Sequence, residues 1–314
     1  MFAPLKDLAA DLAAGKTSSE KLTEEALARI GDAKGEGGKT YTGVFTDAAR
    51  AEAKASDALR AAGVVPSSLA GIPISVKDLF DIRDRVTMAG SVARKDEPAA
   101  GEDAPVVARL RAAGAVILGR TNMTEFAFSG LGLNPHYGTP ENPFDRETGR
   151  IPGGSSSGAA ISVTDGMAAA GIGTDTGGSV RIPSALNGLT GFKPTARRVP
   201  TDGAFPLSWA LDSIGPLARS VNCCALLDAI MAGEAPSDVA PLSVKGMRLV
   251  VPGTMVMDDM DEHVAKAFEA ALDKLSAAGA LLEEKSFEWL LEIPASNKAG
   301  GFAPAEAYAI HREL

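Results

Sequence analysis

Apolar residues recur every three or four positions through the first sixty residues, which is the spacing of one helical face. Gly15 ends the first such run, and Thr17 with Glu20 forms a capping-box pattern before the second. A polar loop rich in glycine and lysine, residues 34–39, precedes the third. The predicted N-terminal helices cover residues 5–12, 22–30 and 48–62.

From residue 66 onward the pattern changes to short apolar runs that alternate with helical segments. The predicted strands cover residues 71–77, 115–118, 168–172, 247–251 and 280–283. The predicted helices cover residues 104–113, 157–166 and 263–278. Strands that alternate with helices are typical of an α/β fold in which helices cover both faces of a sheet.

The chain is predicted to form one domain over residues 1–314, with N-terminal helices in residues 1–65 and a core in residues 66–314. Repeated prolines make residues 134–151 a predicted loop. Residues 200–216 and 234–241 are predicted to be surface connections, and neither is long enough to link two domains.

The composition narrows the class of protein without naming it. Apolar residues make up 45% of the 314 residues, which is ample material for a core. The formal charge of −9 disfavours nucleic acid and anionic membranes as direct partners, although solubility alone also explains such a charge. No run approaches the ~20 apolar residues that a membrane span needs, and the first residues lack a signal-peptide pattern.

Cys223 and Cys224 are adjacent, and a vicinal pair rarely closes a structural disulfide. Reduced thiols in a cytoplasmic protein fit this pattern best. No Cys/His spacing typical of a metal site is present.

Two glycine-rich blocks that contain serines, Gly153–Gly158 and Gly173–Ser179, flank an apolar, alanine-rich segment. Series of glycines expose backbone N–H groups and allow close approach, so the blocks are interpreted as two walls of one site. The first block also matches the nucleophile elbow G-x-S-x-G around Ser156. That motif requires a preceding strand, and residues 150–153 make a poor one. No G-K-[ST] closes a phosphate loop, and a purely structural helix start remains open.

Lys77 ends a β-branched run and can either extend its ammonium to solvent or be buried for a chemical purpose. A serine nucleophile needs a base, and the chain has only three histidines. Lysine can serve as that base once desolvation removes its proton.

Ser179 follows two glycines, so several backbone N–H groups can converge beside its hydroxyl as an oxyanion hole requires. Asp175 and Arg181 could order this loop by ion pairing, and a structural role and a chemical role both stay open for them.

These residues resemble the amidase signature family. The resemblance rests on Lys77 in its Val76–Asp78 context and on the two glycine blocks in the right order. It extends over nearly the whole chain, including residues 119–126 and 191–195. It implies an α/β fold with a mixed central sheet.

The resemblance also implies roles for individual residues. Ser179 is the expected acylated nucleophile, Ser155 the proton relay beside a cis peptide bond, and Lys77 the base. The expected oxyanion donors are the backbone N–H groups of Thr176, Gly177, Gly178 and Ser179. Residues 126–129, with Ala127 and Ser129 among them, are expected to line the acyl side of the pocket.

The implied activity is hydrolysis of a small-molecule carboxamide to an acid and ammonia or an amine, and the resemblance implies neither a metal nor an organic cofactor. The amide-hydrolysing subunit of a glutamine-dependent tRNA amidotransferase is the nearest alternative. Such subunits usually read Asp-Glu-Phe-Ala-Met-Gly where this chain has Thr124–Ser129, which favours a free-standing amidase. The third alternative is an inactive fragment with a binding or scaffold role.

The chain departs from the family pattern at Ser157, where glycine is more usual, and in its length. Relatives continue beyond Leu314, so the chain is expected to lack a C-terminal part that normally completes the sheet and one side of the pocket. The substrate is not specified by the sequence, and a homodimer is left open.

Overall fold

The computed structural model describes residues 1–236 and 239–312, which divide into two compact units. The first unit contains residues 1–236 and 306–312, and the second contains residues 239–305. The boundary near residue 238 lies within the connection 234–241, which was expected to be too short to link domains. That residues 1–314 form a single domain stays a prediction.

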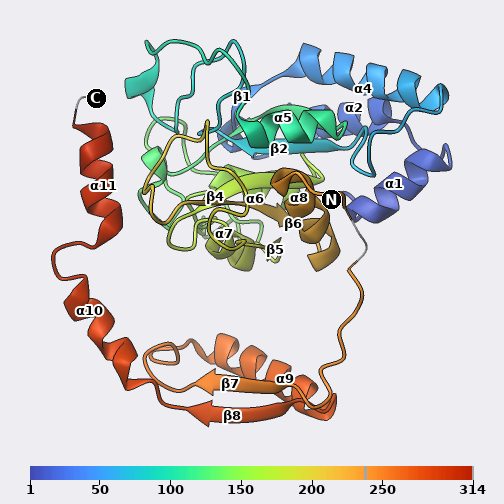
Figure 1. Cartoon of the computed structure of the whole chain (residues 1–314). Coiled ribbons are helices and arrows are strands. Elements are labelled where there is room, and N and C mark those ends of the chain that lie inside the picture. Colours follow the sequence, from blue (N-terminus) through green and yellow to red (C-terminus); the bar gives the residue numbers. More distant parts are fainter. Residues whose placement is uncertain (237–238, 313–314) are drawn as a thin grey trace. The chain divides into compact units, whose positions relative to one another are not determined.

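The first unit is built on a six-stranded mixed sheet with the order β1-β3-β2-β4-β6-β5 (Figure 1). The strands are β1 (Tyr41–Val44), β2 (Pro73–Lys77), β3 (Val116–Thr121), β4 (Ala170–Asp175), β5 (Thr190–Gly191) and β6 (Ser213–Ala218). β2 runs parallel to both β3 and β4, whereas β1, β5 and β6 pair antiparallel with their neighbours. The predicted α/β fold with a mixed central sheet is confirmed.

All residues of the four central strands, β3, β2, β4 and β6, are buried. Burial on both faces explains why β2, β3 and β4 have apolar runs rather than alternating ones. The surface connection predicted for residues 200–216 is present over residues 200–212, and the prediction was wrong for residues 213–216, which belong to β6. Its Gly215 and Pro216 look like strand breakers, yet Pro216 pairs with Ile172 of β4. A side chain at Gly215 would collide with the backbone of Phe192, so the close approach requires glycine.

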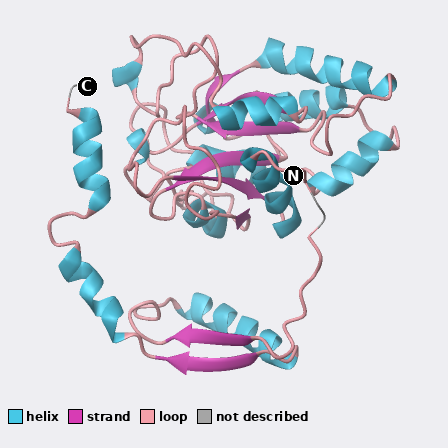
Figure 2. Cartoon of the chain, in the orientation of Figure 1, coloured by secondary structure: helices cyan, strands magenta, loops and turns pink. Residues whose placement is uncertain are grey.

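Helices cover both faces of this sheet (Figure 2). In the first unit they are α1 (Leu5–Ala13), α2 (Ser19–Ile30), α3 (Gly37–Thr40), α4 (Thr46–Ala61), η1 (Val92–Arg94), α5 (Pro105–Ala112), η2 (Glu125–Ala127), α6 (Ser157–Thr164), α7 (Arg181–Leu186) and α8 (Val221–Ala232). α11 (Phe302–His311) belongs to this unit from Glu306 onward. α4 packs on β3, α8 on β6, and α6 on β2, β3 and β4. Every residue of α6 is buried.

The helices predicted for residues 5–12, 22–30, 48–62, 104–113 and 157–166 are all present, with shifted ends. The cap of α2 is Ser18 rather than Thr17, since the Ser18 hydroxyl accepts from the N–H of Lys21 at 3.1 Å. α3 begins inside the predicted loop 34–39. α8 was missed because apolar residues lie all round it, which hides the helical period.

The second unit contains β7 (Arg248–Pro252), α9 (Glu262–Ala277), β8 (Leu281–Lys285), η3 (Glu288–Glu292) and α10 (Ile293–Ser296). β7 and β8 are parallel, as their connection through α9 requires. The two strands and the helix predicted here are confirmed. Among residues 239–305, Ala280 is the only buried one. No helix in the described residues is long and apolar enough to cross a membrane.

Candidate active site

The ends of three neighbouring strands bring the predicted site together. β2 ends at Lys77 and the parallel strand β4 ends at Asp175, so both residues lie at the same edge of the sheet. β6 runs the other way, and its first residue, Ser213, pairs with Asp175. Residues far apart in the sequence therefore meet at this edge, which is where α/β proteins usually place their sites.

Lys77 is fully buried, which rules out the alternative that its ammonium extends to solvent. Its Nζ lies 2.7 Å from the Ser155 hydroxyl and 2.9 Å from the Thr174 hydroxyl. Burial lowers the pKa of Lys77 to about 7, although the charges of Asp212 and Asp175 act in the opposite direction. A substantial fraction of this amine is therefore neutral at neutral pH and able to accept a proton.

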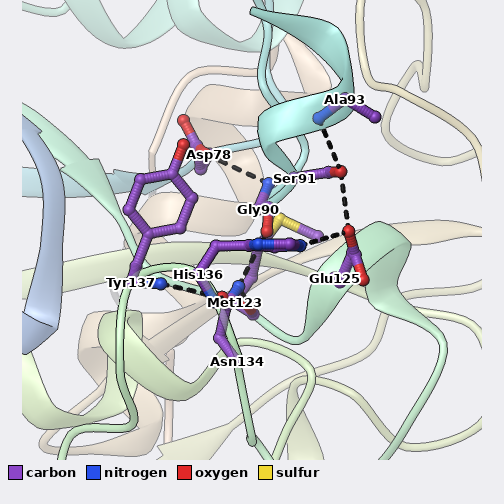
Figure 3. Close-up of polar contacts among 9 residues, drawn as sticks. All are labelled: Asp78, Gly90, Ser91, Ala93, Met123, Glu125, Asn134, His136 and Tyr137. Atoms are coloured by element: carbon purple, nitrogen blue, oxygen red, sulfur yellow. Dashed lines mark hydrogen bonds and ion pairs between the residues drawn. The ribbon is translucent and has the colours of Figure 1, made fainter.

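Asp78 follows Lys77 but belongs to a different environment. Its Oδ2 accepts from the N–H of Gly90 at 3.1 Å (Figure 3). Its Oδ1 lies 3.7 Å from Nη1 of Arg120. Burial raises the pKa of Asp78 to about 6, while Arg120 and the Gly90 N–H limit that rise. The carboxylate next in sequence to Lys77 is thus turned away from the amine.

Ser155 and Ser179 are both buried at the point where the two glycine blocks meet. The Gly154–Ser155 peptide bond is cis. The backbone N–H of Ser156 donates to the carbonyl of Ser179 at 3.3 Å, which joins the two blocks directly. Among the described residues no hydrogen bond links the Ser155 and Ser179 hydroxyls. Such catalytic contacts are often long in unliganded enzymes and shorten when substrate binds.

The nucleophile-elbow alternative does not fit the surroundings of Ser156. This side chain is completely buried, and its hydroxyl lies 3.4 Å from the carbonyl oxygen of Thr174. Ser156 precedes α6 without a strand before it, since the structure assigns no strand to residues 122–169. A nucleophile needs access to substrate, and this hydroxyl has none.

Asp175 orders the second glycine block, as its position beside Arg181 suggested. Its carboxylate accepts from the Arg181 guanidinium at 2.8 and 2.9 Å. It also accepts from the backbone N–H groups of Gly178, Val180 and Arg181, at 2.8, 3.1 and 3.3 Å. The N–H of Gly178, one of the predicted oxyanion donors, therefore donates to Asp175 in this structure. Thr176, Gly177 and Ser179 remain as candidates.

The predicted acyl-side residues lie on a loop that runs beside the first glycine block. The N–H of Thr124 donates to the carbonyl of Ser155 at 3.1 Å, and the N–H of Gly154 donates to the carbonyl of Gly130 at 2.8 Å. Between these anchors, Phe126 and Ala127 have φ of 49° and 61°, a left-handed conformation that is costly for both.

Ala127 is buried, whereas the Ser129 hydroxyl accepts from the N–H of Leu131 at 3.1 Å. The Phe126 ring contacts His311 and Phe205, at centroid distances of 4.4 and 5.6 Å. The rings of Phe205 and His311 therefore pack against the Phe126 side chain of this loop. The sequence did not indicate that either residue lies there.

A hydrogen-bond network fixes this loop from its outer side (Figure 3). Oε1 of Glu125 accepts from the Ser91 hydroxyl and contacts Nε2 of His136, both at 2.7 Å. The Ser91 hydroxyl also accepts from the N–H of Ala93 at 3.2 Å. Burial raises the pKa of Glu125, but Ser91 and His136 outweigh it, so the net shift is downward. Glu125 therefore stays ionised and holds two segments against the loop.

Two further polar residues at the site were not identified from the sequence. Thr174 provides the second hydroxyl on Lys77, and the hydroxyl-rich block Gly173–Ser179 was a usable signal for it. Asp212 accepts from the Thr176 hydroxyl at 2.5 Å. Nothing in the sequence pointed to Asp212, because only the antiparallel pairing of β6 with β4 brings it close. No cluster of metal-ligating side chains occurs in the described part of the chain.

Known proteins are similar to this chain in both sequence and fold. The amidase family matches residues 21–312. The chain is 40% identical over 275 residues to 2-amino-5-chloromuconic acid deaminase of Comamonas testosteroni, covering 86% of this chain and 58% of that protein. It is 41% identical over 321 residues to a glutamyl-tRNA(Gln) amidotransferase subunit of Anaeromyxobacter dehalogenans strain 2CP-C, covering 96% and 63%.

A crystal structure of an amidase superimposes with a TM-score of 0.88 at 36% identity, over 99% of this chain and 69% of the other. The chain spans 58% to 63% of the length of the two curated relatives named above. The family match covers far more than half of the chain, and the same fold is found in a solved relative. The chain belongs to the amidase signature family.

Proposed function

We propose that this chain carries the acyl-transfer centre of an amidase that hydrolyses a carboxamide to a carboxylic acid and ammonia or an amine. The observation that carries the proposal is the buried Lys77 amine, 2.7 Å from the Ser155 hydroxyl. A lysine whose pKa burial lowers to about 7 can act as a base near neutral pH.

In this mechanism neutral Lys77 takes the proton of the Ser155 hydroxyl, and Ser155 takes the proton of Ser179. Oγ of Ser179 then forms a bond to the carbonyl carbon of the amide. The developing oxyanion is stabilised by backbone N–H groups of Thr176, Gly177 and Ser179. The C–N bond breaks as Ser155 gives its proton to the leaving nitrogen and takes one back from the Lys77 ammonium, which releases ammonia or an amine.

The second half of the reaction uses the same groups. Water loses a proton to the Ser155–Lys77 relay and attacks the Ser179 ester. The ester bond breaks, Ser179 regains its proton, and the carboxylic acid leaves. Proton transfer through a fixed relay gives rate factors of about 10²–10⁴, so most of the remaining acceleration must come from the oxyanion hole and from substrate positioning.

The test is ammonia release over a panel of aliphatic amides, aromatic amides and glutamine, with Ser179→Ala as the matched control. We expect release by the wild-type chain and none by the variant. Turnover that persists in Ser179→Ala would contradict the proposed nucleophile.

A glutamine amidase subunit of a tRNA-dependent amidotransferase is the second candidate. Identity of 41% to such a subunit favours it. The loop Thr124–Ser129 argues against it, because its sequence differs from the usual one of those subunits. Glutamine hydrolysis that appears only when a partner subunit co-purifies would favour the second candidate over the first.

A further inference from the structure

Asp212 is bonded to two separate segments at the edge of the sheet that carries the proposed site. One carboxylate oxygen accepts from the Thr176 hydroxyl at 2.5 Å. The other accepts from the backbone N–H groups of Leu207 and Ser208, at 2.9 and 3.1 Å. The carboxylate therefore joins the loop before β6 to the first residue of the proposed oxyanion loop.

We propose that Asp212 is a positioning residue, which holds Thr176 so that its backbone N–H and that of Gly177 face the carbonyl oxygen of the substrate. This inference rests on the proposed function. An oxyanion hole works only if its donors are fixed within a few tenths of an ångström of the place where the charge develops. A hydroxyl–carboxylate bond is short and strong enough to give that precision.

The loop needs this anchor because its middle has no side chains to pack. A side chain added at Gly177 would meet no atom within 4 Å, so no side-chain packing on that side helps to fix this residue. Asp175 fixes the following half of the loop through the N–H groups of Gly178 and Val180. The half before Gly177 depends on Thr176, and the Thr176 side chain is bonded to Asp212.

The loop that carries Asp212 has an external support of its own. Oε2 of Glu306, on α11, accepts from the Ser208 hydroxyl at 2.5 Å and from the N–H of Ala210 at 3.2 Å. Thr176, Asp212, Ser208 and Glu306 thus form a continuous path of hydrogen bonds away from the oxyanion loop. Loss of the outer bond should affect the site less than loss of the inner one.

Asp212 also differs from Asp175 in how its charge is compensated. The carboxylate of Asp175 is paired with the Arg181 guanidinium, whereas the three donors to Asp212 named above are neutral. Asp212 and Asp175 are the charged groups that act on Lys77, and the Ser155 and Thr174 hydroxyls contact its amine. Removal of the Asp212 charge should therefore change the ionisation of the base as well as the loop.

The experiment compares Thr176→Val, which keeps the shape but loses the donor, with Thr176→Ser, which keeps the hydroxyl. For the best amide of the panel, we expect Thr176→Val to lower kcat by about 10- to 100-fold with KM changed by less than about threefold, because the oxyanion is bound only in the transition state. Thr176→Ser should restore kcat to within about fivefold of wild type. Thr148→Val is the control, since its hydroxyl bonds Asp145 at 2.6 Å in an exposed turn.

Asp212→Asn provides a second readout that loss of folding alone would not produce. It keeps an oxygen that can accept from Thr176 but removes the charge, so the rise of kcat/KM with pH should move to lower pH. Glu306→Gln should leave that ionisation in place and lower kcat less than Asp212→Asn does. Rates are divided by the number of sites labelled at completion by a fluorophosphonate, which corrects for misfolded protein.

Each result separates this inference from the proposed function. Wild-type turnover together with an unchanged kcat in Thr176→Val would overturn the positioning role and leave the amidase proposal standing. Equal losses in Thr176→Val and Thr176→Ser would also overturn it, because packing rather than the hydrogen bond would then be responsible. A wild-type chain that hydrolyses no amide and takes no label would overturn both.

Discussion

The amine of Lys77 lies 2.7 Å from the hydroxyl of Ser155, and both side chains are completely buried. Its second contact, at 2.9 Å, is the Thr174 hydroxyl, so both groups that it touches are neutral. The negative charges of Asp175 and Asp212 act on the amine electrostatically, without a hydrogen bond to it. A buried amine with neutral contacts loses its proton readily, which a structural lysine held by a carboxylate would not do.

The first prediction concerns the identity of the nucleophile. Ser179→Ala should abolish amide turnover and covalent labelling by a fluorophosphonate, because the Ser179 hydroxyl supplies the attacking oxygen in the proposed mechanism. Ser156→Ala should keep substantial labelling, since the Ser156 hydroxyl is buried beside the Thr174 carbonyl. Mass spectrometry of the labelled peptide identifies the residue, and a label on Ser156 would restore the nucleophile-elbow alternative.

The second prediction concerns the pH dependence of the rate. The free enzyme should show kcat/KM that rises with pH through one ionisation near the Lys77 value of about 7. Lys77→Ala should lose that ionisation and orders of magnitude in rate. Lys77→Arg should also fail, because a guanidinium stays protonated at these pH values.

His136 is the control for this assignment, because histidine ionises in the same pH range. Its ring contacts Glu125 rather than the relay, so His136→Ala should keep the ionisation in place. A profile that retains its rise in Lys77→Ala and loses it in His136→Ala would contradict the lysine mechanism.

The third prediction concerns stability, with the sign set by the same pKa. Burial lowers the pKa of Lys77 from its ordinary value of 10.5, expected in the unfolded chain, to about 7 in the folded chain. Between these values the unfolded chain binds the extra proton, so the free energy of unfolding rises with pH, by up to about 1.4 kcal/mol per pH unit. The destabilisation by Lys77 is complete below about pH 7 and is lost above about pH 10.5.

Lys77→Met removes this titration and fills a similar volume. The variant should therefore be more stable than wild type at pH 6, with a difference that narrows by pH 9. Urea unfolding at the two pH values measures it. A constant difference between the two proteins would show that Lys77 does not change its protonation on folding in this range.

The fourth prediction compares the two members of one ion pair. The Asp175 side chain is fully buried and holds three backbone N–H groups, whereas that of Arg181 is 53% exposed. Asp175→Ala should cost about 3–5 kcal/mol of stability, because it leaves buried partners unsatisfied. Arg181→Ala should cost about 1 kcal/mol or less, because water replaces the exposed guanidinium. Thermal and urea unfolding of the two variants decide this, and equal losses would contradict it.

The sequence predicted the parts of this molecule that are encoded locally. Lys77 at the end of an apolar run and the serines within glycine blocks were recognisable because each depends on a few adjacent residues. The strand Ser213–Ala218 was not, since its Gly215 and Pro216 resemble a turn and only pairing with β4 makes them a strand.

Contacts between distant segments explain the remaining omissions. Asp212 and Thr176 are 36 residues apart in the sequence. The antiparallel pairing of β4 with β6 brings the Asp212 carboxylate to 2.5 Å from the Thr176 hydroxyl. The Gly178 N–H was predicted to be an oxyanion donor. Its hydrogen bond to Asp175 was missed, because the reach of that carboxylate across the turn is not visible from spacing. Tertiary structure, rather than local pattern, decides which of several similar groups is available for chemistry.

The last prediction concerns the loop on the acyl side of the site. The left-handed backbone of Phe126 and Ala127 costs about 1–2 kcal/mol per residue. The Glu125 carboxylate contacts the Ser91 hydroxyl and the His136 ring at 2.7 Å each, so we expect these bonds to help hold that conformation. Removal of the Glu125 charge should let the loop relax toward ordinary backbone angles.

Glu125→Gln should therefore raise KM for amides with bulky acyl groups by about three- to tenfold more than for acetamide-sized ones, since only the bulky groups reach the loop wall. The rate at which a small fluorophosphonate labels Ser179 should change by less than about twofold, because Lys77 and Ser155 are untouched. Glu141→Gln is a matched control: the Glu141 carboxylate is equally exposed and bonds Lys39 at 3.0 Å. Parallel KM changes for bulky and small amides would show that Glu125 supports folding without shaping the acyl pocket.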